Sequence, residues 1–298
     1  MRADRRRGCA LLLLAALASV ALAACTSSPP KDAPGTASVV SAPARVARTK
    51  LGPVGYRVVG TGPPLVLIMG YGLTMEGWDP RLVHALAGHH RVVMFDNAGI
   101  GRTRQLPVTA SIDDMADQTS ALITALRLGR PDVLGWSLGG AVAQALAVRH
   151  PAQVRGLVLC ATFPGNTTDV AAPATAPPVN GGDFPANQTG AYDAAKAAIA
   201  EYPTTARAPA LAKAQQVGAL SDWNVGHDAA GLRTGQITAR TLIADGAEDA
   251  LDPVGNGQTL HHLIRGSQLK LYPDAGHAFL FQDWSSFAAE VNRFLAAA

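Results

Sequence analysis

Charged residues are scarce in this sequence, at 16% of its 298 residues, and aromatic residues make up only 5%. The formal net charge of +3 comes from the N-terminus, because residues 1–24 hold four of the 25 basic residues and one of the 22 acidic residues. The remainder is therefore balanced, at 21 of each sign. A protein that binds nucleic acid needs a basic surface to neutralise phosphates, so this balance argues against nucleic acid as a partner.

Repeats are also missing: neither heptads nor a period of 20–50 residues stands out, so no repeat architecture is predicted. What residues 1–24 do show is the layout of an export signal, with a positively charged start followed by an unbroken run of small and apolar residues. That run is short and alanine-rich for a membrane-spanning helix, which needs ~20 strongly apolar residues. A secretory signal is the better interpretation.

The end of this signal allows two cleavage patterns. Ala21-Leu22-Ala23 suits ordinary signal cleavage, whereas Leu22-Ala23-Ala24-Cys25 resembles a bacterial lipobox. The lipobox implies cleavage before Cys25 and a diacylglycerol on its thiol. We prefer it, because a cysteine at this junction would otherwise be an unprotected exposed thiol. The expected protein is exported and lipid-anchored through Cys25 on the extracytoplasmic face of a bacterial cell membrane. Cys160 then remains alone, so no disulfide forms within the mature chain.

Beyond the signal, the composition predicts a tether followed by one folded domain. Residues 25–45 are rich in Ser, Pro, Ala and Thr and have little to bury, which predicts a disordered tether. Residues 46–298 are long enough for one large domain. Within that domain, strand-like and helix-like segments alternate. The expected strands are 54–59, 65–69, 91–95, 131–135, 154–159, 241–244 and 268–271, and the expected helices are 114–128, 138–149, 254–264 and 287–296.

This alternation predicts an α/β fold, with a mostly parallel central sheet and helices on both faces. The pattern breaks at about residues 164–238, where Pro, Gly and Ala dominate and an alanine-rich helical stretch is interrupted at Pro203 and Pro209. We interpret this insertion as a cap over a small apolar pocket. A disordered loop is the alternative for its first half.

The sequence Gly135-Trp136-Ser137-Leu138-Gly139 lies between an expected buried strand and an expected helix. Glycines around the serine leave room for a tight, strained turn that lifts the hydroxyl out of the sheet. The N–H groups at the start of the following helix favour negative charge at this position. Ser137 is therefore the predicted nucleophile.

A serine hydroxyl needs a base, and the base needs a carboxylate to hold it. Of the eight histidines, His277 alone follows a turn after the last expected strand, where catalytic loops gather in open α/β sheets. Four acids lie close together after strand 241–244, and Asp245, Asp249 and Asp252 are weighed for the third role. Asp249 lies in the turn beyond the strand and is preferred. Asp252 precedes Pro253 and could cap a helix, and Asp245 is still near the strand.

These motifs resemble the α/β-hydrolase superfamily from about residue 46 to the C-terminus, in the order Ser, Asp, His that this fold uses. The matching segments are 65–72, 95–101, the Ser137 turn, 245–253 and 276–277. The resemblance implies an oxyanion hole made by the backbone N–H groups of Tyr71 and Leu138. It also implies that Asp96 supports a loop near the site. Relatives usually have His-Gly where this chain has Met69-Gly70, which leaves the bracing of that loop open.

The resemblance implies a carboxylesterase-like serine hydrolase that acts on a small-molecule ester without a cofactor or metal. Two alternatives stay open. One is a cofactor-free haloperoxidase or perhydrolase that uses the same triad. The other is a non-catalytic, lipid-anchored binding protein, against which an intact triad argues. Trp78 could line the pocket or belong to the core.

Overall fold

The structure is a computed structural model, and it describes residues 39–165, 183–204 and 208–297. The predicted signal, Cys25 and most of the predicted tether lie outside the described residues. Val39 and Ala42 are buried in the core, so packed residues extend further toward the N-terminus than residue 46. Within the described residues, no helix is long and apolar enough to cross a membrane.

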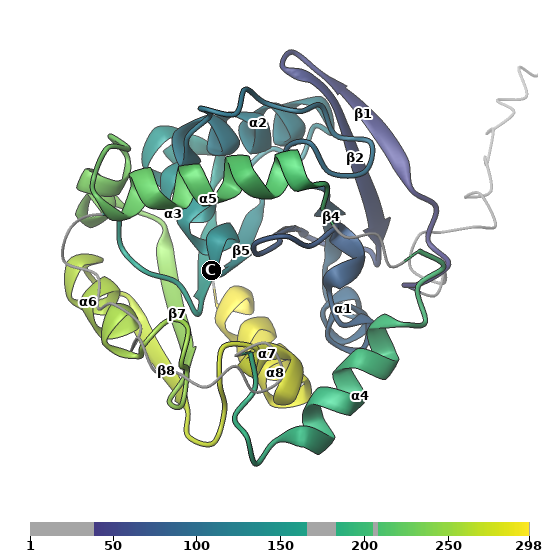
Figure 1. Cartoon of the computed structure of the whole chain (residues 1–298), viewed down its shortest axis with the longest axis vertical. Coiled ribbons are helices and arrows are strands. Elements are labelled where there is room, and N and C mark those ends of the chain that lie inside the picture. The colour runs from purple at the N-terminus through teal and green to yellow at the C-terminus, as the bar shows by residue number, and fades with distance from the viewer. Residues whose placement is uncertain (1–38, 166–182, 205–207, 298) are drawn as a thin grey trace, which may run out of the picture. The chain divides into compact units, whose positions relative to one another are not determined.

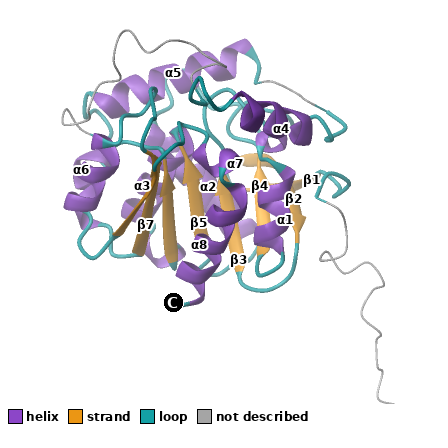
Figure 2. Ribbon diagram, turned by 90° about the horizontal axis from the view of Figure 1, so that it is seen from below, coloured by secondary structure: helices purple, strands orange, loops and turns teal. Residues whose placement is uncertain are grey.

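An eight-stranded sheet forms the centre of the domain (Figures 1 and 2), with the strand order β1-β2-β4-β3-β5-β6-β7-β8. The pairs β1–β2 and β2–β4 are antiparallel, and all other pairs are parallel. The strands are β1 (Arg45–Thr49), β2 (Gly52–Val59), β3 (Pro64–Ile68), β4 (Arg91–Phe95), β5 (Asp132–Trp136), β6 (Gly156–Cys160), β7 (Arg240–Gly246) and β8 (Gln268–Tyr272). The predicted α/β fold with a mostly parallel sheet is confirmed.

Helices cover both faces of this sheet. They are α1 (Pro80–Ala87), α2 (Ile112–Ala125), α3 (Leu138–Arg149), α4 (Thr189–Ile199), α5 (Ala210–Asn224), α6 (Gly255–Leu263), α7 (Phe279–Gln282) and α8 (Trp284–Ala296), with short 3-10 turns at η1 (Met75–Gly77), η2 (Pro151–Gln153) and η4 (Gly231–Gln236). Each predicted strand and helix has a counterpart here, with ends shifted by a few residues. Strand β1 and helices α1 and α7 were not predicted.

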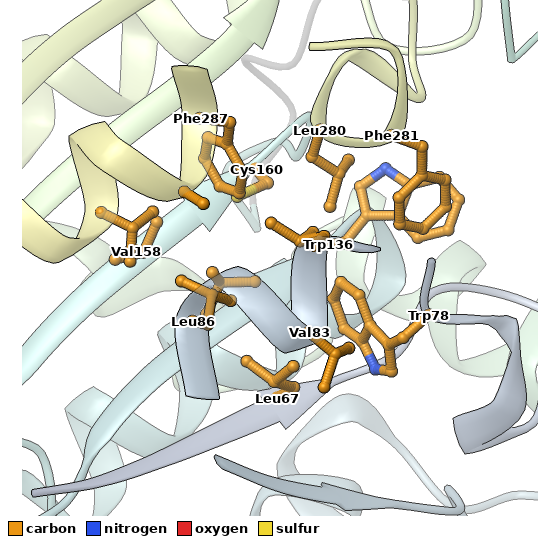
Figure 3. Close-up of a cluster of buried hydrophobic side chains, with 14 of the residues drawn as sticks. Leu67, Trp78, Val83, Leu86, Trp136, Val158, Cys160, Leu280, Phe281 and Phe287 are labelled. Atoms are coloured by element: carbon orange, nitrogen blue, oxygen red, sulfur yellow. The ribbon is translucent and has the colours of Figure 1, made fainter. Parts of the chain in front are cut away.

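The buried side chains divide into two layers because successive residues of a strand point to opposite faces. In β3, Leu65 and Leu67 join the layer under α1 and α8, while Val66 and Ile68 join the layer under α2 and α3. Figure 3 shows part of the first layer, where Leu67 lies among side chains from α1, α7 and α8. Burial on both faces explains why these strands read as continuous apolar runs.

The described part of the predicted cap consists mainly of α4 and α5, which lie across one end of the sheet (Figure 2). Two hydrogen bonds fasten α5 and its N-terminal flank to the loop after β3. Gln216 Oε1 accepts from the Gly72 N–H at 2.8 Å, and the Ala208 N–H donates to the Gly72 carbonyl at 3.2 Å. The cap is thus attached to the loop that follows β3.

Candidate active site

Ser137 occupies a strained turn between β5 and α3. Its backbone angles, φ 56° and ψ −122°, lie in a region that residues other than glycine rarely adopt. The turn is held from several sides: the Ser137 N–H donates to the Cys160 carbonyl at 2.9 Å, and Thr162 Oγ1 donates to the Ser137 carbonyl at 2.9 Å. Such strain persists only where the surroundings fix it, so the fold is built to present this serine.

Glycine is required next to this turn because other chain segments approach closely. A Cβ on Gly139 would lie 2.0 Å from the Ile68 carbonyl oxygen, and one on Gly135 would lie 2.2 Å from the Gly139 carbonyl oxygen. Helix α3 can therefore begin directly against β3. The N–H groups of Gly140 and Ala141 donate to the Ser137 carbonyl, and among the described residues the Leu138 N–H has no backbone partner and can face a ligand near Ser137.

The structure brings Asp249 and His277 together. His277 Nδ1 donates to Asp249 Oδ2 at 2.8 Å, and the Asp249 carboxylate is fully buried. The other oxygen, Asp249 Oδ1, accepts the N–H groups of Leu251 and Asp252, both at 2.8 Å. The carboxylate is thus oriented by the backbone on one side and orients the imidazole on the other.

The Asp249 carboxylate also stabilises the charged form of His277. Burial acts against the imidazolium, but the charge and hydrogen bond of Asp249, with smaller effects of Asp252 and Asp183, raise the pKa of His277 to about 9. A histidine arranged in this way holds a proton firmly once it has accepted one.

His277 is linked to the nucleophile turn through Trp136. The indole Nε1 of Trp136 donates to the His277 carbonyl at 3.0 Å, and the two rings lie 5.6 Å apart. Among the described residues, no hydrogen bond joins the Ser137 hydroxyl to the His277 ring. In free enzymes such bonds are often long and tighten when substrate binds.

The other two candidate acids have different surroundings. Asp252 Oδ1 accepts from Asn256 Nδ2 at 2.6 Å, which ties Asp252 to the first turn of α6. Asp245 is buried in β7, where its Oδ1 accepts from the Ala161 N–H at 3.0 Å. Burial, with Asp252 and Asp249 nearby, raises the pKa of Asp245 well above its usual range.

The loop after β3 lies beside the nucleophile. A Cβ on Gly70 would lie 3.4 Å from Ser137 Cβ, so the backbone at Tyr71 passes close to the serine. Among the described residues, the N–H groups of Tyr71 and Leu138 donate no backbone hydrogen bond, which leaves both available to a ligand. The Tyr71 side chain is exposed.

Sequence reasoning left open how this loop is braced, and the structure supplies the contacts. Asn97 Nδ2 donates to the Met69 carbonyl at 2.9 Å, and Asp96 Oδ1 accepts from the Met75 N–H at 2.8 Å. These two hydrogen bonds hold the loop by its backbone, so the loop needs no hydrogen bond from the side chain of residue 69. The Met69 side chain is instead buried in the core. Trp78 is also fully buried and packs against Trp136, with 6.4 Å between ring centroids, so it belongs to the core.

Sequence reasoning missed Asp183, which comes from the cap. Its backbone carbonyl accepts from the Ala278 N–H at 2.8 Å, next to His277. Burial raises the pKa of the Asp183 carboxyl, against the attraction of His277. No local pattern marks this residue, because the contact depends on how the cap folds back. In the described residues, no group of three His, Cys, Asp or Glu side chains could hold a metal ion.

Comparisons with known proteins show the family of the chain. The family described as "alpha/beta hydrolase fold" matches residues 63–192. A protein of Variovorax paradoxus that carries the name carbamate hydrolase RutD is 30% identical over 268 residues, which cover 82% of this chain and 96% of that protein. This chain belongs to the α/β hydrolase fold family.

Two further relatives show the range of the family. A pimeloyl-(acyl-carrier protein) methyl ester esterase of Chromobacterium violaceum is 32% identical over 239 residues, covering 74% of this chain and 89% of that enzyme. The solved structure of a thermophilic esterase from Thermogutta terrifontis superposes with a TM-score of 0.69 at 21% identity, covering 86% of this chain and 99% of that one. The second likeness concerns the fold alone.

Proposed function

We propose that this α/β hydrolase is a serine esterase that cleaves carboxylic esters through an acyl-enzyme on Ser137. The observation that carries the proposal is the strained Ser137 turn beside the buried Asp249–His277 pair. A protein that only binds a ligand has no need of a strained serine. It also has no need of a histidine beside that serine or of a carboxylate fixed by two backbone N–H groups, and such features are costly to maintain. The relatives, which include esterases, carbamate hydrolases and haloperoxidases, support a hydrolase.

In this proposal, His277 Nε2 takes the proton of the Ser137 hydroxyl as Oγ attacks the ester carbonyl. The N–H groups of Tyr71 and Leu138 hold the oxyanion of the tetrahedral intermediate, and each such donor is typically worth about 3 kcal/mol. Asp249 stabilises the imidazolium that forms. His277 then gives its proton to the departing alcohol, and a water molecule repeats the cycle to release the acid and free Ser137.

The experiment is a chain-length series of p-nitrophenyl esters with wild-type protein and Ser137→Ala. We expect Ser137→Ala to lower kcat by about 10⁴–10⁶ while the thermal melt is unchanged. Wild-type turnover by purified Ser137→Ala would refute the assignment of the nucleophile.

A perhydrolase or cofactor-free haloperoxidase reaction is the second candidate, because haloperoxidases occur among the relatives and the same triad would serve both reactions. In it, hydrogen peroxide replaces water as the group that attacks the acyl-enzyme and releases a peracid. Competition between peroxide and water for one acyl-enzyme measures the balance of the two activities.

We further propose that the chain is exported and that Cys25 carries the lipid anchor. The support is the sequence Leu22-Ala23-Ala24-Cys25 after a positively charged, apolar segment. The domain would then act at the outer face of the cell membrane, on esters that reach it from outside the cytoplasm.

A further inference from the structure

A cavity of about 390 Å³ lies beside the candidate triad, between α4 and the body of the domain. Its wall includes Trp136 and Ala278, which are the sequence neighbours of Ser137 and His277. A group bound in this cavity lies near the Ser137 turn and His277, although neither residue lines the cavity itself. Its size is within the usual range of small-molecule sites.

Aromatic side chains are concentrated around this cavity. They make up 5% of the chain but four of the fourteen lining residues: Trp136, Phe184, Tyr192 and Phe281. The rings form two edge-to-face pairs, with 5.0 Å between the centroids of Trp136 and Phe281 and 5.6 Å between those of Phe184 and Tyr192. The faces of aromatic rings carry partial negative charge, and walls of this kind attract organic cations.

Two carboxylates line the same cavity, and they differ in their partners. Glu76 forms an ion pair with Arg57 and accepts the Thr204 hydroxyl, so its charge is compensated. For the Asp183 carboxylate, no hydrogen bond or ion pair is found among the described residues. Asp183 is half-buried, and the partial loss of water around its carboxylate favours a positive charge that enters beside it.

A lysine that lines the same cavity shows an ammonium–ring contact. The exposed Lys196 of α4 places its ammonium Nζ 5.8 Å from the centroid of the Tyr192 ring. An ammonium group from the protein itself thus lies on one of these rings.

We infer that this cavity binds an alkylammonium group of the substrate, with the Asp183 carboxylate opposite the charge and the four aromatic rings around it. This inference rests on the proposed esterase function and adds a substrate class to it: esters that carry a tertiary or quaternary amine in the acyl or the alcohol part. Asp183 is then a specificity-determining residue rather than part of the triad.

The test uses two pairs of substrates that differ in one atom, nitrogen or carbon. For the acyl part, p-nitrophenyl 4-(trimethylammonio)butanoate is compared with p-nitrophenyl 5,5-dimethylhexanoate. For the alcohol part, butyrylthiocholine is compared with S-(3,3-dimethylbutyl) thiobutanoate. The ratio of kcat/KM within each pair is measured for wild type, for Asp183→Asn and for Asp193→Asn. Asp193 is the matched control, because it is exposed on α4 and does not line the cavity.

We expect wild type to prefer the cationic member of at least one pair by about tenfold, mainly through KM. Asp183→Asn should abolish most of that preference, and Asp193→Asn should retain it. The ratio is independent of the fraction of correctly folded enzyme. Tetramethylammonium should inhibit hydrolysis of the neutral ester competitively, and less so in Asp183→Asn.

Two results would overturn the inference while leaving the proposed function intact. One is hydrolysis of both neutral esters at least as fast as their cationic partners. The other is a cation preference that survives in Asp183→Asn. Failure to hydrolyse any of the four substrates would instead contradict the esterase proposal itself.

Discussion

Replacing Asp249 by Asn changes one atom of the candidate triad and should cost on the order of 10⁴ in kcat, by analogy with serine proteases. The structure shows why. Asp249 Oδ1 accepts two backbone N–H groups, and only the oxygen of an asparagine can keep those bonds. The amide nitrogen must then face His277 Nδ1 and donate to it. The ring proton moves to Nε2, which can no longer accept the Ser137 proton.

The lost charge supplies part of this cost. The pKa of His277 stands at about 9 rather than 6.5, which corresponds to about 3 kcal/mol in favour of the imidazolium, or on the order of 10² in rate. The wrong tautomer accounts for the remainder.

The assay is kcat with one activated ester for Asp249→Asn and for Asp252→Asn, alongside thermal melts. Asp252 accepts from Asn256 on α6, whereas the His277 ring bonds Asp249, so Asp252→Asn should affect stability more than kcat. Near-normal kcat in Asp249→Asn, together with a collapse in Asp252→Asn, would refute this reasoning.

Three further predictions concern other parts of the chain. Because the neutral form of His277 is the base and the pKa of His277 in the folded protein is about 9, kcat/KM should rise from pH 7 toward pH 9. The same raised pKa stabilises the folded protein fully below about pH 6.5, and this stabilisation is lost as the pH rises through about 9. Chemical denaturation at several pH values should show that loss in wild type and not in Asp249→Asn. Gly139→Ala should destabilise the fold by about 3 kcal/mol, because its Cβ would lie 2.0 Å from the Ile68 carbonyl oxygen. Gly190→Ala is the control, since the space around its new Cβ is open and no destabilisation is expected. Equal melting temperatures for the two variants would contradict the packing argument. Cys25→Ser should move the protein from the membrane fraction to the soluble fraction, and a wild-type N-terminus without a lipid mass would dismiss the anchor.

The elements that sequence reasoning predicted are those whose pattern follows from their own burial. Strand β3 is buried on both faces and reads as a continuous apolar run, and helix α3 is buried on almost every side. Strand β1 was missed because it lies at the edge of the sheet, where most of its side chains are solvent-exposed or half-buried. Helix α1 was missed despite its Asp79 cap and Pro80 start, because it is only eight residues long.

Some residues of the candidate site could also be predicted from the sequence, and others could not. Ser137, His277 and Asp249 each follow a strand, so their positions in the chain indicate that they meet at one edge of the sheet. Choosing between Asp249 and Asp252 needs the direction of each side chain, and the sequence does not contain that. Asp183 could not be predicted, because its neighbourhood depends on the path of the cap across the domain.

Labelling with a fluorophosphonate tests the central claim most directly, because the probe reacts with a serine only when that serine is activated as a nucleophile. We predict one covalent adduct per chain in wild-type protein, mapped to Ser137 by peptide mass spectrometry, no adduct in Ser137→Ala, and much slower labelling in Asp249→Asn. An unlabelled, correctly folded wild-type protein, or an adduct on any other residue, would contradict the account.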